Sequence, residues 1–148
     1  MKRHWVIATR GRRRGFTLME AALTTIIVGV GVTGMLQLLA AGTSANIDAS
    51  EQTTAMNLAK NVREWTLQKT YDQVRAMDGQ EYTPPRDSSG SVIGNLTGWK
   101  QSLTMTAVDP DRLTRTLIDT SPDVIRITTI VSHDGKSVAQ LVWYRFKP

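Results

Sequence analysis

The feature that most constrains this chain is a run of 27 residues without a charged side chain, from Ala21 to Ile47. Its most apolar part, Ala21 to Ala41, would measure about 32 Å as a helix, which matches a bilayer hydrocarbon core of about 30 Å. The apolar segment of a secretory signal peptide is shorter, roughly 7–15 residues. The run therefore predicts a helix that stays in a membrane.

The first 15 residues carry the positive charge of the chain. They hold six of its 18 Lys and Arg residues and no acid: Lys2, Arg3, Arg10, Arg12, Arg13 and Arg14. The remainder holds 12 basic and 13 acidic side chains, so its charge does not favour nucleic-acid binding. A short basic segment before an apolar run is typical of an N-terminus kept in the cytoplasm. We therefore expect a single-pass protein whose C-terminal domain lies outside the cytoplasmic membrane.

The helix is predicted to continue beyond the span, because Gly42 is the only glycine or proline between Gly34 and Gly79. In residues 46–71, apolar side chains recur at spacings of three and four and form one stripe: Ala55, Leu58, Ala59, Val62 and Trp65. The pattern predicts one helix from Thr17 to about Tyr71, apolar all round in its first half and amphipathic in its second.

The C-terminal half is predicted to be a loop followed by strands. Residues 78–98 contain four glycines and the pair Pro84–Pro85, which indicates a long surface loop. The apolar period then becomes two, and four strands are expected at Trp99–Val108, Leu113–Asp119, Val124–Ser132 and Ser137–Phe146. Asp134-Gly135 between the last two is a strong hairpin signal.

These elements together predict an α+β fold, in which a long N-terminal α-helix packs on a small antiparallel, four-stranded β-sheet. The expected division is a basic leader at 1–15, a transmembrane half of the helix at 16–45, and a globular domain at 46–148. That domain contains the amphipathic half of the helix, the loop and the sheet.

The sequence offers no catalytic site. With no cysteine there is no disulfide, thiolate metal site or cysteine nucleophile. His4 lies in the leader, and His133 is expected as a solvated residue of a hairpin turn. The acids Asp72, Asp78, Glu81 and Asp87 are interpreted as a solvated loop rather than a metal site. We therefore expect no enzyme, no catalytic residue, no metal and no cofactor.

One short stretch carries a family resemblance. Gly15-Phe16-Thr17-Leu18-Met19-Glu20, preceded by arginines and followed by the apolar run, resembles the cleavage and methylation site of type IV prepilins and type II secretion pseudopilins. The local match is specific, and the sequence resemblance covers about residues 11–45. The layout of helix, loop and sheet resembles that family over nearly the whole chain.

The resemblance implies roles for individual residues. A prepilin peptidase and methyltransferase would cut after Gly15 and N-methylate Phe16. An ionisable side chain inside a membrane costs about 2.5–3.5 kcal/mol at mid-bilayer and usually serves a function. The resemblance implies that Glu20 pairs with the N-terminal amine of a neighbouring subunit, which sets register in a filament, with Phe16, Thr17 and Leu18 beside it.

The resemblance also implies partners and location. The partners are the processing peptidase, other pilin or pseudopilin subunits, the inner-membrane assembly platform and membrane lipid, with no nucleic acid expected. Assembly would carry the chain from the cytoplasmic membrane into an extracellular pilus or a periplasmic pseudopilus. The stretch Gly29–Gly34 and the polar helix after it resemble minor subunits that prime or tip a filament. Two family features are missing, namely a proline in the apolar half of the helix and a C-terminal cysteine pair.

Several alternatives stay open. The chain could be a major pilin subunit, or a plain signal anchor holding a monomeric periplasmic domain, in which case Glu20 has no partner. The stretch Arg13-Arg14-Gly15-Phe16-Thr17-Leu18 also partly fits a twin-arginine export signal. The mature N-terminus distinguishes a prepilin from the anchor and from the export signal. A processed prepilin would begin at methyl-Phe16, a signal anchor would be uncut, and a cleaved export signal would leave a chain that begins at Asn46.

Overall fold

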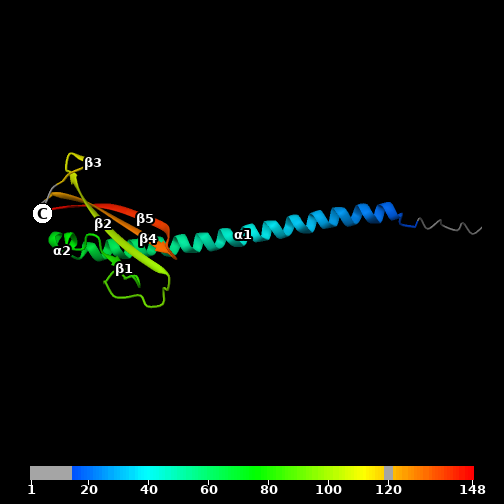
Figure 1. Ribbon diagram of the computed structural model, residues 1–148, viewed down its shortest axis with the longest axis horizontal. Coiled ribbons are helices and arrows are strands. Elements are labelled where there is room, and N and C mark those ends of the chain that lie inside the picture. Colours follow the sequence, from blue (N-terminus) through cyan, green and yellow to red (C-terminus); the bar gives the residue numbers. More distant parts are fainter. Residues whose placement is uncertain (1–14, 119–121) are drawn as a thin grey trace, which may run out of the picture. The chain divides into compact units, whose positions relative to one another are not determined.

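The computed structural model describes residues 15–118 and 122–148. The elements are α1 (Leu18–Leu67), α2 (Tyr71–Arg75), β1 (Glu81–Tyr82), β2 (Trp99–Asp109), β3 (Arg112–Thr116), β4 (Val124–His133) and β5 (Lys136–Phe146) (Figure 1). The α+β fold with a long N-terminal helix and an antiparallel sheet is confirmed. Residue contacts divide the chain into two compact units, of which the first ends at Ser44 and the second is Ala45–Pro148.

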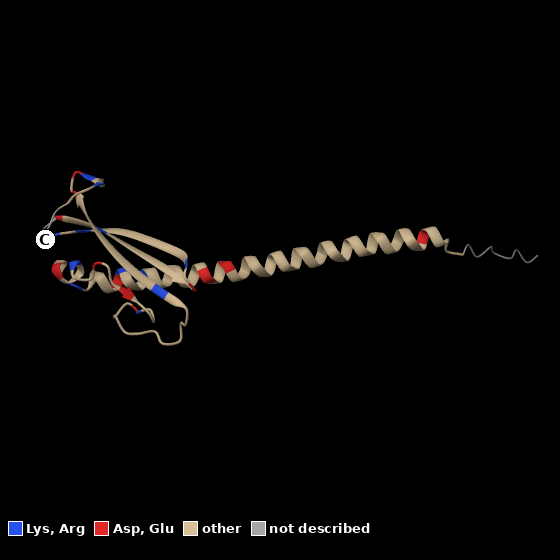
Figure 2. Ribbon diagram, viewed as in Figure 1, with Lys and Arg blue, Asp and Glu red and all other residues tan. Residues whose placement is uncertain are grey.

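The first unit holds the apolar part of α1. No Lys, Arg, Asp or Glu lies between Glu20 and Asp48 (Figure 2), and the helix is long and apolar enough to cross a membrane. The hydroxyls of Thr24, Thr25 and Thr33 each donate to the carbonyl four residues earlier, at 2.7–2.8 Å. These polar side chains are thus satisfied within the helix, as a lipid environment requires.

The sheet forms the body of the second unit. Its strand order is β1-β2-β4-β5, with β3 paired to the far end of β2, and every pairing is antiparallel. A two-residue turn joins β4 to β5, with Asp134 at φ 49° and Gly135 at φ 83°. Positive φ at both positions is the type I′ geometry that the pair Asp-Gly favours. The expected hairpin is therefore confirmed.

Two details of the expected sheet are wrong. The strand expected at Leu113–Asp119 is β3, which runs from Arg112 to Thr116, and Asp119 lies outside the described residues. The expected loop at 78–98 contains the two-residue strand β1, in which Glu81 pairs with Ser102 and Tyr82 with Gln101. A strand this short has no alternation of its own, so only its partner β2 defines it.

The core lies between the second half of α1 and one face of the sheet (Figure 1). The predicted stripe is buried, with Ala55, Leu58, Ala59 and Val62 at most 2% exposed. Trp65 is only half-buried, and its neighbour Thr66 is fully buried instead. The side chains that meet the stripe come mainly from β2, β4 and β5: Trp99, Leu103, Ile125, Ile127, Val131, Ala139 and Trp143.

The helix ends earlier than predicted, at Leu67 rather than near Tyr71. Thr70 starts the separate helix α2, because its side chain accepts from the Gln73 amide while the Gln73 side chain accepts from the Thr70 amide. The guanidinium of Arg145 on β5 donates to the carbonyls of Thr66 and Lys69. These carbonyls lie at and just beyond the end of α1, so a residue 79 and 76 positions further along the chain satisfies them.

Gln101 ties the loop to the helix. This side chain is fully buried on β2, where its amide nitrogen donates to the carbonyls of Leu58 and Arg86, each at 3.0 Å. Its amide oxygen accepts from the backbone N–H of Arg86 at 2.7 Å. The side chain therefore satisfies three buried or half-buried backbone groups from α1 and the loop.

Replacing Gln101 by Met is expected to destabilise the domain by about 2–5 kcal/mol. Methionine has a similar length but leaves the N–H and the C=O of Arg86 unpaired, and it removes the second donor to the Leu58 carbonyl, which already accepts a hydrogen bond within α1. Each unpaired buried group costs about 1–3 kcal/mol before relaxation. Urea unfolding of the detergent-solubilised chain, followed by tryptophan fluorescence, measures this. The matched control is Gln140→Met, at an exposed position on β5, which should change stability by less than about 0.5 kcal/mol.

Candidate functional site

The predicted processing site lies at the first turn of α1. Gly15, Phe16 and Thr17 precede the helix, which begins at Leu18. The Thr17 hydroxyl accepts from the Glu20 amide at 3.2 Å, and the Thr17 carbonyl accepts from the Ala21 amide at 3.1 Å. Thr17 is therefore the N-cap of the helix. The expected cleavage position falls two residues before this cap, in non-helical backbone.

Glu20 occupies the third helical position, in the first turn of α1. A carboxylate there is favoured by the unpaired N–H groups and the positive end of the helix dipole, by about 0.3–1 kcal/mol. The sequence itself carries a signal for this placement, in addition to the features used to predict the helix. Thr17-Leu18-Met19-Glu20 matches the pattern Ser/Thr-x-x-Glu of a capping box, of which the Thr17 half is formed.

The residues around the cleavage position are open to their surroundings. Phe16 is 73% exposed and Leu18 is 90% exposed. A Cβ placed on Gly15 would meet nothing within 4 Å among the residues that the structure describes. The fold of this chain therefore does not itself require glycine at position 15.

α1 continues without interruption through the stretch Gly29–Gly34. On one of its faces, a shallow hollow of about 320 Å³ is lined by Gly29, Val30, Thr33, Gly34 and Gln37. Small residues on one face of a membrane helix allow another helix to approach closely. Gln37 adds a polar amide to this otherwise mostly apolar surface.

The expectation of a solvated His133 is wrong. His133 is the last residue of β4, and its side chain is only 26% exposed. Its ring stacks on Trp99, with ring centroids 4.4 Å apart and planes 9° apart, and its Nδ1 lies 3.1 Å from Glu51 Oε1. His133 thus links β4 to β2 and to α1. Its role in packing follows from tertiary contacts that the local turn signal did not reveal.

The four acids of the predicted loop have separate surroundings. Asp72 lies in the first turn of α2. Asp78 accepts from the Met105 amide at 2.6 Å, Glu81 lies 3.0 Å from Lys100 Nζ, and Asp87 accepts from Ser89 and Ser91. In residues 15–118 and 122–148, no three His, Asp or Glu side chains gather in a group suited to a metal ion.

Asp87 closes a tight turn in the loop. Hydrogen bonds from the Ser89 hydroxyl and from the Ser91 amide hold the pKa of its carboxyl below the usual range. The ionised form is therefore the one that supports the turn. We expect the turn to loosen as the pH falls through this lowered pKa, because protonation removes the acceptor that holds the turn. The amide resonances of Ser89 and Ser91 should move with that titration in an NMR spectrum, and in Asp87→Asn they should not.

Comparison of this chain with protein-family models, curated proteins and solved structures gave no match. The candidate site therefore rests on the residues themselves. It consists of Gly15 and Phe16 ahead of the helix, Thr17 at its cap, and Leu18 and Glu20 in its first turn.

Proposed function

We propose that this chain is a prepilin-like precursor, cut after Gly15 and N-methylated on Phe16, and then assembled as a minor subunit of a type IV pilus or type II secretion pseudopilus. It would begin as a single-pass protein of the cytoplasmic membrane. No catalytic activity of its own is part of the proposal. Its partners would be the processing peptidase, other subunits and the assembly platform.

One observation carries the proposal. A glycine is followed by Phe-Thr-Leu-Met-Glu, and Leu18 of this stretch begins a helix of 50 residues whose next charged residue after Glu20 is Asp48. The cut would remove six cations and create a new amine on Phe16. This amine would remain protonated after methylation, so it offers a cation at the same end of the helix as Glu20.

Mass spectrometry of the N-terminal peptide from native membranes tests the proposal. The expected peptide starts at Phe16 and carries one extra methyl group. A chain that still begins at Met1 would contradict the proposal, and so would a mature chain that begins at Asn46.

A plain signal anchor is the second candidate, and one contact favours it. The Thr17 hydroxyl bonds to the Glu20 amide, and the first turn of a helix tolerates an acid without any partner. In that case Glu20 would serve only to start the helix. The uncut N-terminus in the same mass spectrum identifies this candidate.

A further inference from the structure

β5 forms an open edge of the sheet. In the strand order it is an end strand with β4 as its neighbour, and among the described residues no other strand pairs with it. After an irregularity in the pairing near its start, the stretch Ala139–Tyr144 contains no charge and no proline. Natural sheets usually protect such an edge with charges, prolines, bulges or covering loops.

The opposite edge of the same sheet is closed. β1 covers Gln101 and Ser102 of β2, and β3 covers Val108 and Asp109. Between them, Leu103 bonds through both its N–H and its C=O to residues 79 and 80, at 2.9–3.0 Å. Two further hydrogen bonds cover the stretch between Leu103 and β3. The Met105 amide donates to the Asp78 carboxylate, and the Leu117 amide donates to the Ala107 carbonyl. The β2 edge of the sheet is thus covered, whereas the β5 edge is open.

The pairing register shows which β5 groups face outwards. Leu103 turns both backbone groups away from β4, so its neighbour Thr104 turns both towards β4, where it pairs with Thr128. Thr128 is also opposite Val142 on β5, and the backbone N–H and C=O of Thr128 are both directed to β2. Val142 therefore directs its N–H and C=O away from β4. By the same alternation, so do Gln140 and Tyr144.

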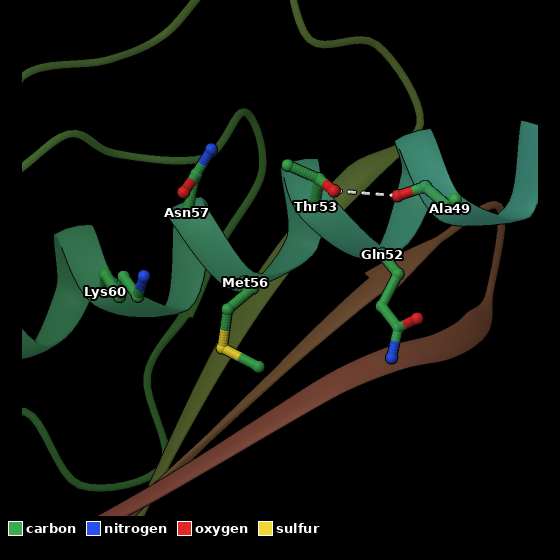
Figure 3. A pocket seen from close by; sticks show the side chains of 6 residues that line it. All are labelled: Ala49, Gln52, Thr53, Met56, Asn57 and Lys60. Carbon is green, nitrogen blue, oxygen red and sulfur yellow. Dashed lines mark hydrogen bonds between the residues drawn. The ribbon is translucent and has the colours of Figure 1, made fainter. Parts of the chain in front are cut away.

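A hollow on α1 lies beside this edge. The helix residues Ala49, Gln52, Thr53, Met56, Asn57 and Lys60 line a shallow space of about 390 Å³. Gln52 also lines a second space of about 170 Å³, together with Asp48 and Glu51 of α1 and with Lys136, Ser137 and Val138 of β5. Figure 3 shows the side chains of Gln52 and Met56 extending from α1 towards β5. The lining of the larger space carries a single charge, on Lys60.

We propose that the β5 edge binds an extended segment of a partner protein, which adds a strand antiparallel to β5. Its backbone would pair with Gln140, Val142 and Tyr144. Its alternate apolar side chains would contact Met56 on α1, and an acidic residue early in the segment would lie near Lys60. Backbone pairing supplies the affinity in this mode of recognition, and the adjoining hollow supplies selectivity.

The charge pattern favours a strand from another protein over a second copy of β5. From Lys136 to Phe146 this chain carries two cations, Lys136 and Arg145, and no acid. A second β5 would therefore bring no acid to Lys60. An extended segment from another protein, with an acid ahead of alternating apolar residues, complements both the edge and the hollow.

The test uses a synthetic octapeptide with blocked ends, Asp followed by alternating Val and Thr, below the concentration at which it self-associates. Binding to the full chain in detergent micelles is measured by NMR titration. Val142→Pro removes one outward N–H but leaves the pairing with β4 intact. It should weaken binding by about tenfold, whereas Val142→Ala, which keeps the N–H, should stay within about threefold.

A second peptide, with Lys in place of Asp, tests the charge. It should bind the native chain about threefold more weakly, and Lys60→Glu should reverse this preference. If Val142→Pro does not fold, Gln140→Pro tests the same edge. No saturable binding of the Asp peptide, or equal binding to the proline variant, would overturn the proposal.

A second copy as occupant would also overturn it. Because the chain has no cysteine, Gln140→Cys introduces the only thiol. Disulfide-linked dimers of this variant in native membranes would identify a second copy at the β5 edge. We expect none above the level of the control Thr104→Cys, which lies exposed on β2.

Discussion

Gly15→Ala is expected to leave the precursor uncut. The added methyl group must enter the pocket of the peptidase, and a pocket that discriminates by one methyl group reduces the reaction by about 10- to 200-fold. Among the described residues, that methyl group would contact no atom of the chain itself within 4 Å. A failure of cutting would therefore report on recognition by the peptidase rather than on folding. Intact mass of the chain from native membranes measures the effect.

Gly42→Ala is the matched control for this experiment. Gly42 also lies in open surroundings, on α1, and far from the cleavage position in sequence. The Gly42 variant should mature like the native chain. A normal mature mass for Gly15→Ala would refute the assignment of the cut, while leaving the membrane anchor in place.

Glu20→Gln is expected to mature normally and then to fail in assembly. Glutamine keeps the shape of the side chain and removes its charge. If Glu20 pairs with a methylated Phe16 amine of a neighbouring subunit, that amine is left as an unpaired charge in apolar surroundings, which costs about 3–5 kcal/mol. Such a cost corresponds to a loss of more than about a hundredfold in incorporation. Sedimentation of sheared filaments, with the chain quantified by mass spectrometry, measures incorporation.

Two further variants separate the charge of Glu20 from its effect on the helix. Thr17→Ala removes the N-cap, which costs about 1 kcal/mol, but keeps the acid. Asp48→Asn removes the next acid along α1. Both should incorporate far better than Glu20→Gln. Native incorporation of Glu20→Gln would refute the pairing and favour the helix-start role of this acid.

The elements that sequence reasoning predicted well are those with a strong local period. The stripe from Ala55 to Val62 repeats at helical spacing, and it is buried as expected. Alternation and the Asp134-Gly135 turn were sufficient to place β4 and β5. In these segments the local pattern and the tertiary packing favour the same structure.

The errors occur where a distant residue decides the structure. The end of α1 depends on Arg145, which no helical pattern near Leu67 includes. β1 exists because β2 lies beside it, and His133 is half-buried because Trp99 and Glu51 cover it. The Thr17 cap was different, because its signal was local and readable from the sequence. The role proposed for Gly15 and Phe16 lies outside the fold, since it would depend on another protein.

The order of the strands has a consequence for how the domain matures as it is synthesised. β4 lies between β2 and β5, although it is made after both β2 and β3. Until Val124–His133 has emerged, β2 has no partner on the side that β4 later occupies. The stripe on α1 then also lacks Ile127 and Val131, which pack against it in the folded domain. A nascent chain that stops before Val124 would thus expose the apolar face of α1, to which a chaperone could bind. Release of the chaperone should coincide with completion of the β4–β5 hairpin.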